Sequence, residues 1–254
     1  MSIDWADVPV SGLVRERQDR AGVLETFGID YCCGGATTLA NACRERGVSL
    51  EEVRRALEQS DASPCESEEA DWDRESLARL ADHIVARHHA YLHEQLPRVE
   101  ALLEKVVARH AERHPYLLEL REVYAGLRNE LIPHMMKEEQ VLFPYIRLLD
   151  EALSKGQPAP PFPCGSVREP IRVMEDEHQS AGDALRRMRE LTLGFRPPED
   201  ACDAYRKLMN YLRSLESDLH LHIHKENNIL FPRAAAAEGA APPSVAQAIE
   251  IRVG

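Results

Sequence analysis

The chain carries one eleven-residue pattern twice, and this duplication constrains the fold more than any other feature. Residues 134–144 and residues 222–232 both read H-x-x-K-E-x-x-[V/I]-L-F-P, at an offset of 88 positions. In an α-helix, residues i and i+4 lie on the same face, one turn apart. Each copy therefore places an imidazole next to a carboxylate, beside an apolar patch. Two such pairs that face each other across a helical bundle could hold two metal ions.

The repeat extends beyond these two segments. His89 and His178 are 89 residues apart, and each precedes the histidine of its own motif copy by 45 or 44 residues. If one helix runs from His89 to a turn near residue 115 and the next returns, His89 and His134 lie at similar heights, because a helix rises about 1.5 Å per residue. The spacing therefore predicts that six side chains converge at one level of a bundle. These predicted ligands are His89, His134, Glu138, His178, His222 and Glu226.

Acidic residues accompany the predicted ligands. Glu130 and Asp218 each lie four residues before the motif histidine of their copy, so each is placed to accept a hydrogen bond from the second ring nitrogen. Glu177, next to His178, is a further acidic group near the predicted site. An i,i+4 pair of Glu and His can also simply stabilise an exposed helix. The matched spacings and the duplicated acids favour metal binding over that alternative.

The remaining histidines fit the pattern less well. Around a helix, His220 and His224 point away from His222, so both are predicted to face outward. His110 lies 21 residues after His89, which is about 31 Å along an unbroken helix. That separation argues against His110 as a fifth histidine of the same centre.

Imidazole and carboxylate ligands suit iron, manganese or zinc, and carboxylates able to bridge favour a dinuclear centre. The predicted set is rich in histidine, and no Glu-x-x-His pair of the ferritin type aligns with the repeat. This balance favours reversible binding of small ligands such as O₂ or NO over forcing oxidations.

A second chemical feature lies near the N-terminus, where Cys32 and Cys33 are followed by Gly34 and Gly35. We expect the glycines to leave both thiols exposed, and we expect the start of the next helix to lower the thiol pKa. The pair is interpreted as a redox, metal-transfer or partner-docking site. The alternative is two incidental cysteines in a tight turn. The other four cysteines show no ligand spacing.

The whole chain is predicted to be all-α, because apolar residues recur at three- and four-residue steps and strand-like alternation is nearly absent. The predicted organisation is a small helical domain (1–58) that begins with one helix (11–27), an acidic linker (59–72), a four-helix bundle (73–236) and a loose tail (237–254). The long helices are expected at approximately 74–112, 115–153, 167–193 and 199–236. Pro97 is expected to kink or interrupt the first of them.

Charge and hydropathy exclude several classes of protein. The chain has 31 basic and 43 acidic residues, a net charge of −12, which argues against nucleic acid or an anionic membrane as a partner. No apolar run approaches the roughly 20 residues that span a bilayer, and the first residues lack the pattern of a secretory signal. We therefore expect a cytoplasmic protein.

These features together resemble a known family. The block V-L-E-T-F-G-I-D-Y-C-C-G-G resembles the small ScdA-type N-terminal domain of the RIC proteins (repair of iron centres). The region with His89, H-M-M-K-E-E-Q-V-L-F-P, V-M-E-D-E-H and H-I-H-K-E-N-N-I-L-F-P resembles their hemerythrin-like domain. The resemblance covers about residues 11–235. It implies a hemerythrin-like four-helix bundle in which the six residues above bind two non-haem iron ions, oxo- or hydroxo-bridged, with Glu138 and Glu226 bridging.

The resemblance also implies a role. The protein would restore iron–sulfur clusters damaged by oxidative or nitrosative stress, by supplying iron or handling NO, with damaged iron–sulfur proteins as clients. The alternatives are a protein that binds or senses O₂ or NO, a di-iron enzyme that reduces NO to N₂O, and a metal-free bundle. The family has a histidine at the position of His110, which keeps that residue as a candidate ligand against the geometry. The client, the electron donor and a homodimeric state are left open.

Overall fold

The computed structural model describes residues 5–62, 70–163 and 165–240 of the chain. Every regular element within these ranges is a helix, which confirms the predicted all-α class. The chain divides into two compact units. The first consists of Met1–Glu75 together with Leu219–Ile229, and the second consists of Ser76–Asp218 together with Leu230–Gly254.

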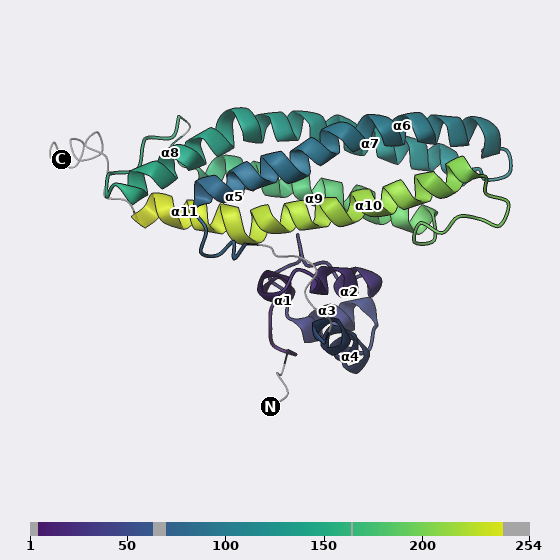
Figure 1. Cartoon of the computed structure of the whole chain (residues 1–254), viewed down its shortest axis with the longest axis horizontal. Coiled ribbons are helices and arrows are strands. Elements are labelled where there is room, and N and C mark those ends of the chain that lie inside the picture. The colour runs from purple at the N-terminus through teal and green to yellow at the C-terminus, as the bar shows by residue number, and fades with distance from the viewer. Residues whose placement is uncertain (1–4, 63–69, 164, 241–254) are drawn as a thin grey trace. The chain divides into compact units, whose positions relative to one another are not determined.

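Four short helices form most of the first unit (Figure 1). They are α1 (Val10–Glu16), α2 (Arg20–Thr26), α3 (Leu39–Arg46) and α4 (Leu50–Asp61). Both α2 and α3 pack against α4. The hydroxyl oxygens of Thr38 and Ser49 accept hydrogen bonds from backbone N–H groups in the first turns of α3 and α4, and these caps fix where the two helices begin.

Two boundaries of this unit differ from the prediction. Arg17 has an extended backbone (φ −153°, ψ 110°), so the single helix expected over 11–27 is two helices. Its guanidinium donates a 2.8 Å hydrogen bond to the carbonyl of Asp61, which stabilises the break. Asp61 is still helical, so α4 extends into the range predicted as a linker, of which residues 63–69 lie outside the described residues.

A four-helix bundle follows, in which the helical rods lie side by side (Figure 1). The rods consist of α5 (Leu77–Ile84) and α6 (Ala90–His110), of α7 (Tyr116–Lys137) and α8 (Phe143–Ser154), of α9 (Arg168–Leu191), and of α10 (Asp203–Lys225) and α11 (Phe231–Ala240). Helix α7 packs against α6 and α9, and α8 packs against α5 and α11. The long helices begin and end within a few residues of the predicted bounds. The last one continues to Ala240, into the range predicted as a loose tail, of which residues 241–254 lie outside the described residues.

A stripe of apolar side chains on each rod forms the core of the bundle. On α6, Leu92, Leu96, Val99 and Leu103 recur at four- and three-residue steps and are at most 1% exposed. This spacing gives one apolar face on a helix, and each fully buried side chain of this size contributes about 1.5–3 kcal/mol. Helix α6 continues through Pro97, so Pro97 does not interrupt it, and the alternative of a kink stays a prediction.

Three of the rods contain a π-helical turn that the sequence pattern did not predict. The turns are η1 (Val85–His89), η2 (Glu138–Leu142) and η3 (Glu226–Leu230). Predicted ligands lie at their ends, because His89 closes η1, Glu138 opens η2 and Glu226 opens η3. Such turns insert an extra residue into a helix and are frequent at functional sites.

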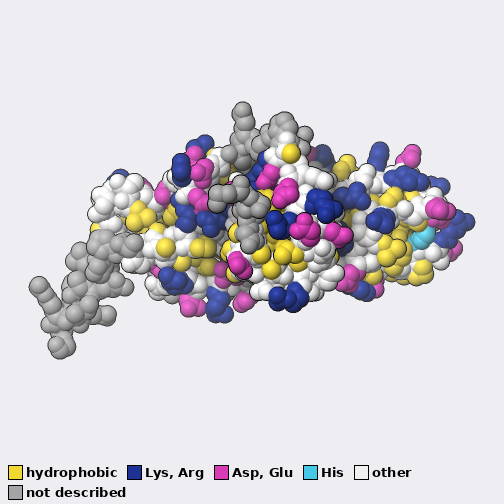
Figure 2. All heavy atoms as spheres, turned by 90° about the horizontal axis from the view of Figure 1, so that it is seen from below, with side chains coloured by type: hydrophobic (Ala, Val, Ile, Leu, Met, Phe, Trp, Pro, Cys, Tyr) yellow, Lys and Arg dark blue, Asp and Glu magenta, His cyan; other side chains and the backbone are white. Residues whose placement is uncertain are grey.

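Side chains of positive and negative charge are mixed on the face of the protein that Figure 2 shows. Lysine and arginine side chains are interspersed there with aspartate and glutamate side chains. This face therefore offers no single-sign field that would attract a polyanion.

Candidate metal centre

The structure brings the six predicted ligands together in two groups. Within each group, one ligand atom from every side chain lies within 4.8 Å of the others. The groups are His89, Glu138, His222 and Glu226, and His134, Glu138, His178 and Glu226. All six side chains are at most 2% exposed. The two groups share Glu138 and Glu226, the residues that the resemblance assigned as bridging.

The carboxylate of Glu138 is fully buried among imidazole nitrogens. Its Oε2 lies 3.3 Å from Nε2 of His89 and 3.4 Å from Nε2 of His134, and neither of its oxygens makes a hydrogen bond with any described residue. An ionised carboxylate removed from water is costly unless a cation or hydrogen-bond donors compensate it. The environment of Glu138 therefore fits a bound metal ion.

The hydrogen bonds at Nδ1 of two histidines strengthen this interpretation. Nδ1 of His89 lies 2.8 Å from Oε1 of Glu139, and Nδ1 of His134 lies 2.8 Å from Oε2 of Glu177. A carboxylate only accepts hydrogen bonds, so each Nδ1 is the donor, and these bonds hold each ring with its Nε2 toward Glu138. Nε2 of His134 is 3.0 Å from Nε2 of His178. The ring nitrogens of these histidines thus gather around the carboxylate, as ligands of a shared metal ion would.

Glu177 and Lys137 form a second layer around His134. Burial opposes ionisation of Glu177, but hydrogen bonds from Lys137 and His134 outweigh it and hold the pKa of this carboxyl below its usual range. The carboxylate therefore stays ionised at neutral pH and orients the imidazole. Outer carboxylates of this kind fix the ring and raise its basicity as a ligand.

The phenylalanine of each L-F-P segment packs against a predicted ligand. The ring of Phe143 stacks on His89 at 5.8 Å with an interplanar angle of 19°, and the ring of Phe231 stacks on His178 at 6.0 Å and 3°. Both phenylalanines are at most 1% exposed. In each half of the chain, the phenylalanine of the motif thus orients the histidine that lies outside the motif. This contact gives a physical reason for the phenylalanine and that histidine to recur together in both halves.

Two parts of the sequence match described protein families. Residues 80–234 match the hemerythrin HHE cation binding domain, and residues 6–61 match a domain of unknown function, DUF542. The probable iron–sulfur cluster repair protein of Haemophilus influenzae is 36% identical over 83% of this chain and 89% of its own length. The iron–sulfur cluster repair proteins YtfE of Escherichia coli O157:H7 and Citrobacter koseri are 35% and 34% identical, over 92% and 93% of this chain and 99% and 100% of their own lengths. The chain belongs to this repair-protein family.

Membership confirms the resemblance seen in the sequence, for both the cysteine-containing segment and the bundle. The family's hemerythrin domain binds cations, and the buried His and Glu groups of this chain suit a non-haem metal. Within the part of the chain that the structure describes, no helix is long and apolar enough to cross a membrane.

His110 lies apart from both ligand groups. Its Nε2 is 3.2 Å from Sγ of Cys202, and its ring packs against Tyr205 at 5.3 Å. Because α6 runs from Ala90 to His110 without reversing, the separation along the helix holds. The structure therefore does not bring His110 to the six predicted ligands, in agreement with the argument from spacing.

The supporting acids differ in part from the prediction. Glu130 is exposed. It was expected to accept a hydrogen bond from Nδ1 of His134, but that nitrogen is bonded to Glu177 of α9 instead. Asp218 lies 3.1 Å from Nδ1 of His88, while its predicted hydrogen bond to His222 stays a prediction. Glu139 was missed, because the second motif copy has an asparagine at the matching position and the repeat therefore gave no signal.

The two histidines predicted to face outward are covered within the first unit. Nδ1 of His224 donates a 3.2 Å hydrogen bond to the carbonyl of Tyr31, and its ring lies edge-on to Tyr31. His224 is 3% exposed, so this outward-pointing side chain is covered by residues of the first unit instead of being open to solvent. The ring of His220 also contacts Tyr31, at 6.0 Å. The turn between α2 and α3 thus packs against the segment that carries His222 and Glu226.

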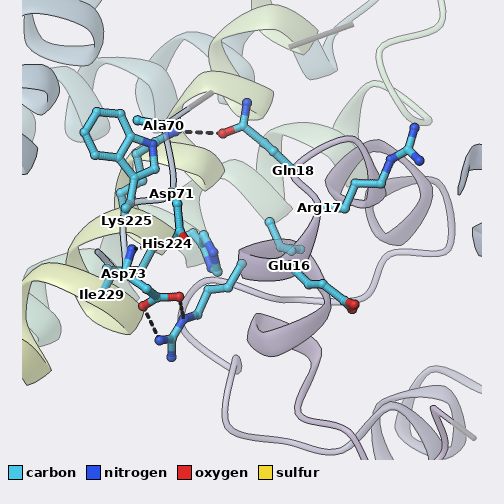
Figure 3. Close-up of a pocket in the computed structure, with 12 residues that line it drawn as sticks. Glu16, Arg17, Gln18, Ala70, Asp71, Asp73, His224, Lys225 and Ile229 are labelled. Carbon is cyan, nitrogen blue, oxygen red and sulfur yellow. Dashed lines mark hydrogen bonds and ion pairs between the residues drawn. The ribbon is translucent and has the colours of Figure 1, made fainter. Parts of the chain in front are cut away.

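A hollow of about 290 Å³ lies in the same unit. Figure 3 shows Lys225 and His224 among its lining residues, together with Gln18 from the break between α1 and α2. The buried ammonium of Lys225 donates a 2.9 Å hydrogen bond to Oε1 of Gln18, and Arg15 is paired with Asp73. The Lys of the second motif copy therefore bonds the N-terminal segment, whereas the Lys of the first copy bonds Glu177.

The cysteine turn also differs from the expectation. Cys32 is 4% exposed rather than open to solvent, and the neighbouring Cys33 thiol, burial and the carboxylate of Asp30 raise its pKa well above the ordinary value. Neither Gly34 nor Gly35 has a positive φ. Gly35 is required instead by close packing, since a Cβ there would lie 2.5 Å from Oδ1 of Asn228.

We expect Glu177→Ala to weaken metal binding by about 10–100-fold, the range typical of a lost outer partner of a ligating histidine. The substitution frees Nδ1 of His134 to change tautomer or orientation. Competition with a chelator of known affinity measures the effect. Glu175→Ala, on an exposed position of the same helix, is the control and should retain its metal. Equal retention by both variants would show that Glu177 does not orient the ligand.

Proposed function

We propose that this protein repairs iron–sulfur clusters damaged by oxidative or nitrosative stress, with damaged iron–sulfur proteins as its clients. The observation that supports this most is the similarity to relatives named iron–sulfur cluster repair proteins over nearly the whole chain. The similarity includes both the cysteine turn and the metal-binding bundle. A protein that only carried or sensed a gas would need the bundle alone.

We propose that the bundle holds two non-haem iron ions, because two ligand groups share two carboxylates. The ligands would be His89, His134, Glu138, His178, His222 and Glu226. Iron in such a site supplies redox chemistry and a position for NO or O₂. The surrounding side chains orient the imidazoles and bury the carboxylates. They also exclude bulk water, so the ions would be held in apolar surroundings.

The repair proposal is tested by adding the iron-loaded protein to a [4Fe–4S] enzyme whose cluster has been damaged with NO. We expect reactivation to exceed that produced by the same amount of free Fe²⁺, because the protein would deliver iron, or remove NO, at the damaged cluster. The metal-free protein is the control. Reactivation equal to that with free Fe²⁺ would count against the proposal.

The composition of the ligand groups supports a second candidate, the binding or reduction of NO. Four imidazoles and only two carboxylates form a histidine-rich set, which favours reversible binding of a diatomic ligand over forcing oxidations. Catalytic N₂O formation by the isolated protein with an electron donor would favour an NO reductase. A reversible optical change with O₂ or NO, without product, would favour a binding or sensing role.

A further inference from the structure

The cysteine turn brings three potential metal ligands to one point. One atom from each of Asp30, Cys32 and Cys33 lies within 4.8 Å of the other two. The two Sγ atoms are 4.0 Å apart, and Sγ of Cys32 is 3.2 Å from Oδ1 of Asp30. These three residues lie within the first unit and are separate from the groups in the bundle.

The sulfur separation fits a shared cation better than a disulfide. A disulfide requires sulfur atoms about 2.05 Å apart. Two thiolates that bind one tetrahedral ion at about 2.3 Å are about 3.8 Å apart, and a thiolate and a carboxylate oxygen on the same ion are about 3.6 Å apart. The observed 4.0 Å and 3.2 Å need only small side-chain adjustments to match these values.

The backbone holds this arrangement in place. Oδ1 of Asp30 accepts hydrogen bonds from the backbone N–H groups of Cys32 and Cys33, at 2.9 Å and 3.0 Å. The carbonyl of Cys32 accepts a 2.9 Å hydrogen bond from Nδ2 of Asn228. The ligand atoms are thus positioned before any ion binds, which lowers the cost of ordering them on binding.

The chemistry of the three groups calls for positive charge. Each carries a negative charge when it is deprotonated, and together with burial their proximity raises the pKa of Cys32. A bound cation reverses this effect, because metal binding releases the thiol protons. A cavity of about 270 Å³ lies on the carboxylate side of the turn, where Asp30, Gly34 and Thr37 are among its lining residues.

We propose that Asp30, Cys32 and Cys33 form a further metal site, which takes a divalent transition-metal ion of intermediate softness and leaves one coordination position open. Two thiolates and one carboxylate suit Fe²⁺, Co²⁺ or Zn²⁺. Three protein ligands with an open position are the mark of a site that exchanges its ion or adds a fourth ligand, rather than a closed structural site.

The site lies against the segment that carries two of the predicted bundle ligands. Asn228 and His224, which bond the carbonyls of Cys32 and Tyr31, flank Glu226 in sequence. An ion in transit between the bundle and a client would therefore find thiolate ligands anchored to the same helical segment. The assignment of Fe²⁺ as the natural ion depends on the proposed repair function. The proposal that the three residues bind a metal ion does not depend on it.

The site is tested in the full-length, iron-loaded protein with reduced thiols under anaerobic conditions. One equivalent of Co²⁺ is added, and X-ray absorption at the cobalt edge reports its ligands without interference from iron. We expect about two sulfur neighbours per cobalt at about 2.3 Å. Cys32→Ser/Cys33→Ser should abolish the sulfur neighbours. Cys202→Ser, which changes a partly exposed cysteine of the second unit, should leave them unchanged.

A milder variant guards against misfolding of the double mutant. Asp30→Asn keeps Oδ1 as an acceptor for both N–H groups, so the turn stays folded, but it removes the carboxylate charge. We expect two sulfur neighbours and an affinity for Co²⁺ about tenfold weaker, equivalent to about 1.4 kcal/mol. Cobalt without sulfur neighbours in the unaltered protein would overturn the site. If cobalt binds as expected but reactivation of a damaged cluster fails, the repair function falls and the site stands.

Discussion

Replacing Glu138 with glutamine should abolish metal binding and, in the metal-free protein, increase stability. Glu138 is fully buried and belongs to both ligand groups, so its loss affects both ions. An amide is a poor metal ligand, and we expect affinity to fall by more than the roughly 100-fold reached by losses around a site. In the metal-free protein the same amide can donate hydrogen bonds to the nearby Nε2 atoms, which removes the cost of a buried carboxylate.

The gain in the metal-free state should be about 1–3 kcal/mol. Metal analysis after dialysis measures the first effect, and urea unfolding with chelator present measures the second. Glu130→Gln removes the same charge from an exposed position of the same rod, and it should stay within about 0.5 kcal/mol of the unaltered protein. If Glu138→Gln retains two metal ions, or destabilises the metal-free protein, the buried carboxylate does not serve as a shared ligand.

The six converging side chains were predictable because each half of the chain records the same spacing. A histidine, an interval of 44 or 45 residues and an H-x-x-x-E pair were sufficient to select six residues from 11 histidines and many glutamates. The periodicity of the helices fixed which residues share a face, and the short turn between His110 and Tyr116 fixed the relative heights of His89 and His134. The Phe of each L-F-P segment was visible in the pattern, but its stacking on His89 or His178 required the packing of the rods.

The outer layer was not predictable from the repeat, because it is not duplicated. Glu139 has an asparagine as its counterpart. Glu177 was expected near the site because it is next to His178, but its bond to His134 of another helix was not. Two of the π-helical turns, η2 and η3, occupy the same positions of the two motif copies, but helical periodicity alone does not distinguish a π-turn from an α-helical one. Met136 and His224 occupy matching positions of the two motif copies, but Met136 is 48% exposed and His224 is 3% exposed. A residue that differs between the copies can therefore indicate a helix face that is covered in one copy and exposed in the other.

Introducing a methyl group at Gly35 should destabilise the first unit by about 3 kcal/mol, at the upper end of the usual cost of overpacking. The added Cβ would lie 2.7 Å from both the carbonyl oxygen of Tyr31 and Cβ of Ser11, and 2.5 Å from Oδ1 of Asn228. The asparagine side chain can rotate away, but a backbone carbonyl and a Cβ cannot move without displacing the turn. We therefore expect Gly35→Ala to disturb the hydrogen bond from Asn228 to Cys32 as well.

Tryptophan fluorescence during urea unfolding isolates this effect, because both tryptophans of the chain, Trp5 and Trp72, belong to the first unit. Gly22→Ala is the matched control. It lies inside α2 with no atom within 4 Å of the added Cβ, so it should stabilise the unit by about 0.5–1 kcal/mol through its higher helix propensity. If the free energy of unfolding falls for Gly35→Ala and rises for Gly22→Ala, the loss at Gly35 is due to close packing. A neutral Gly35→Ala would mean that the turn has room to adjust, and that the cysteine ligands are held less firmly than the structure indicates.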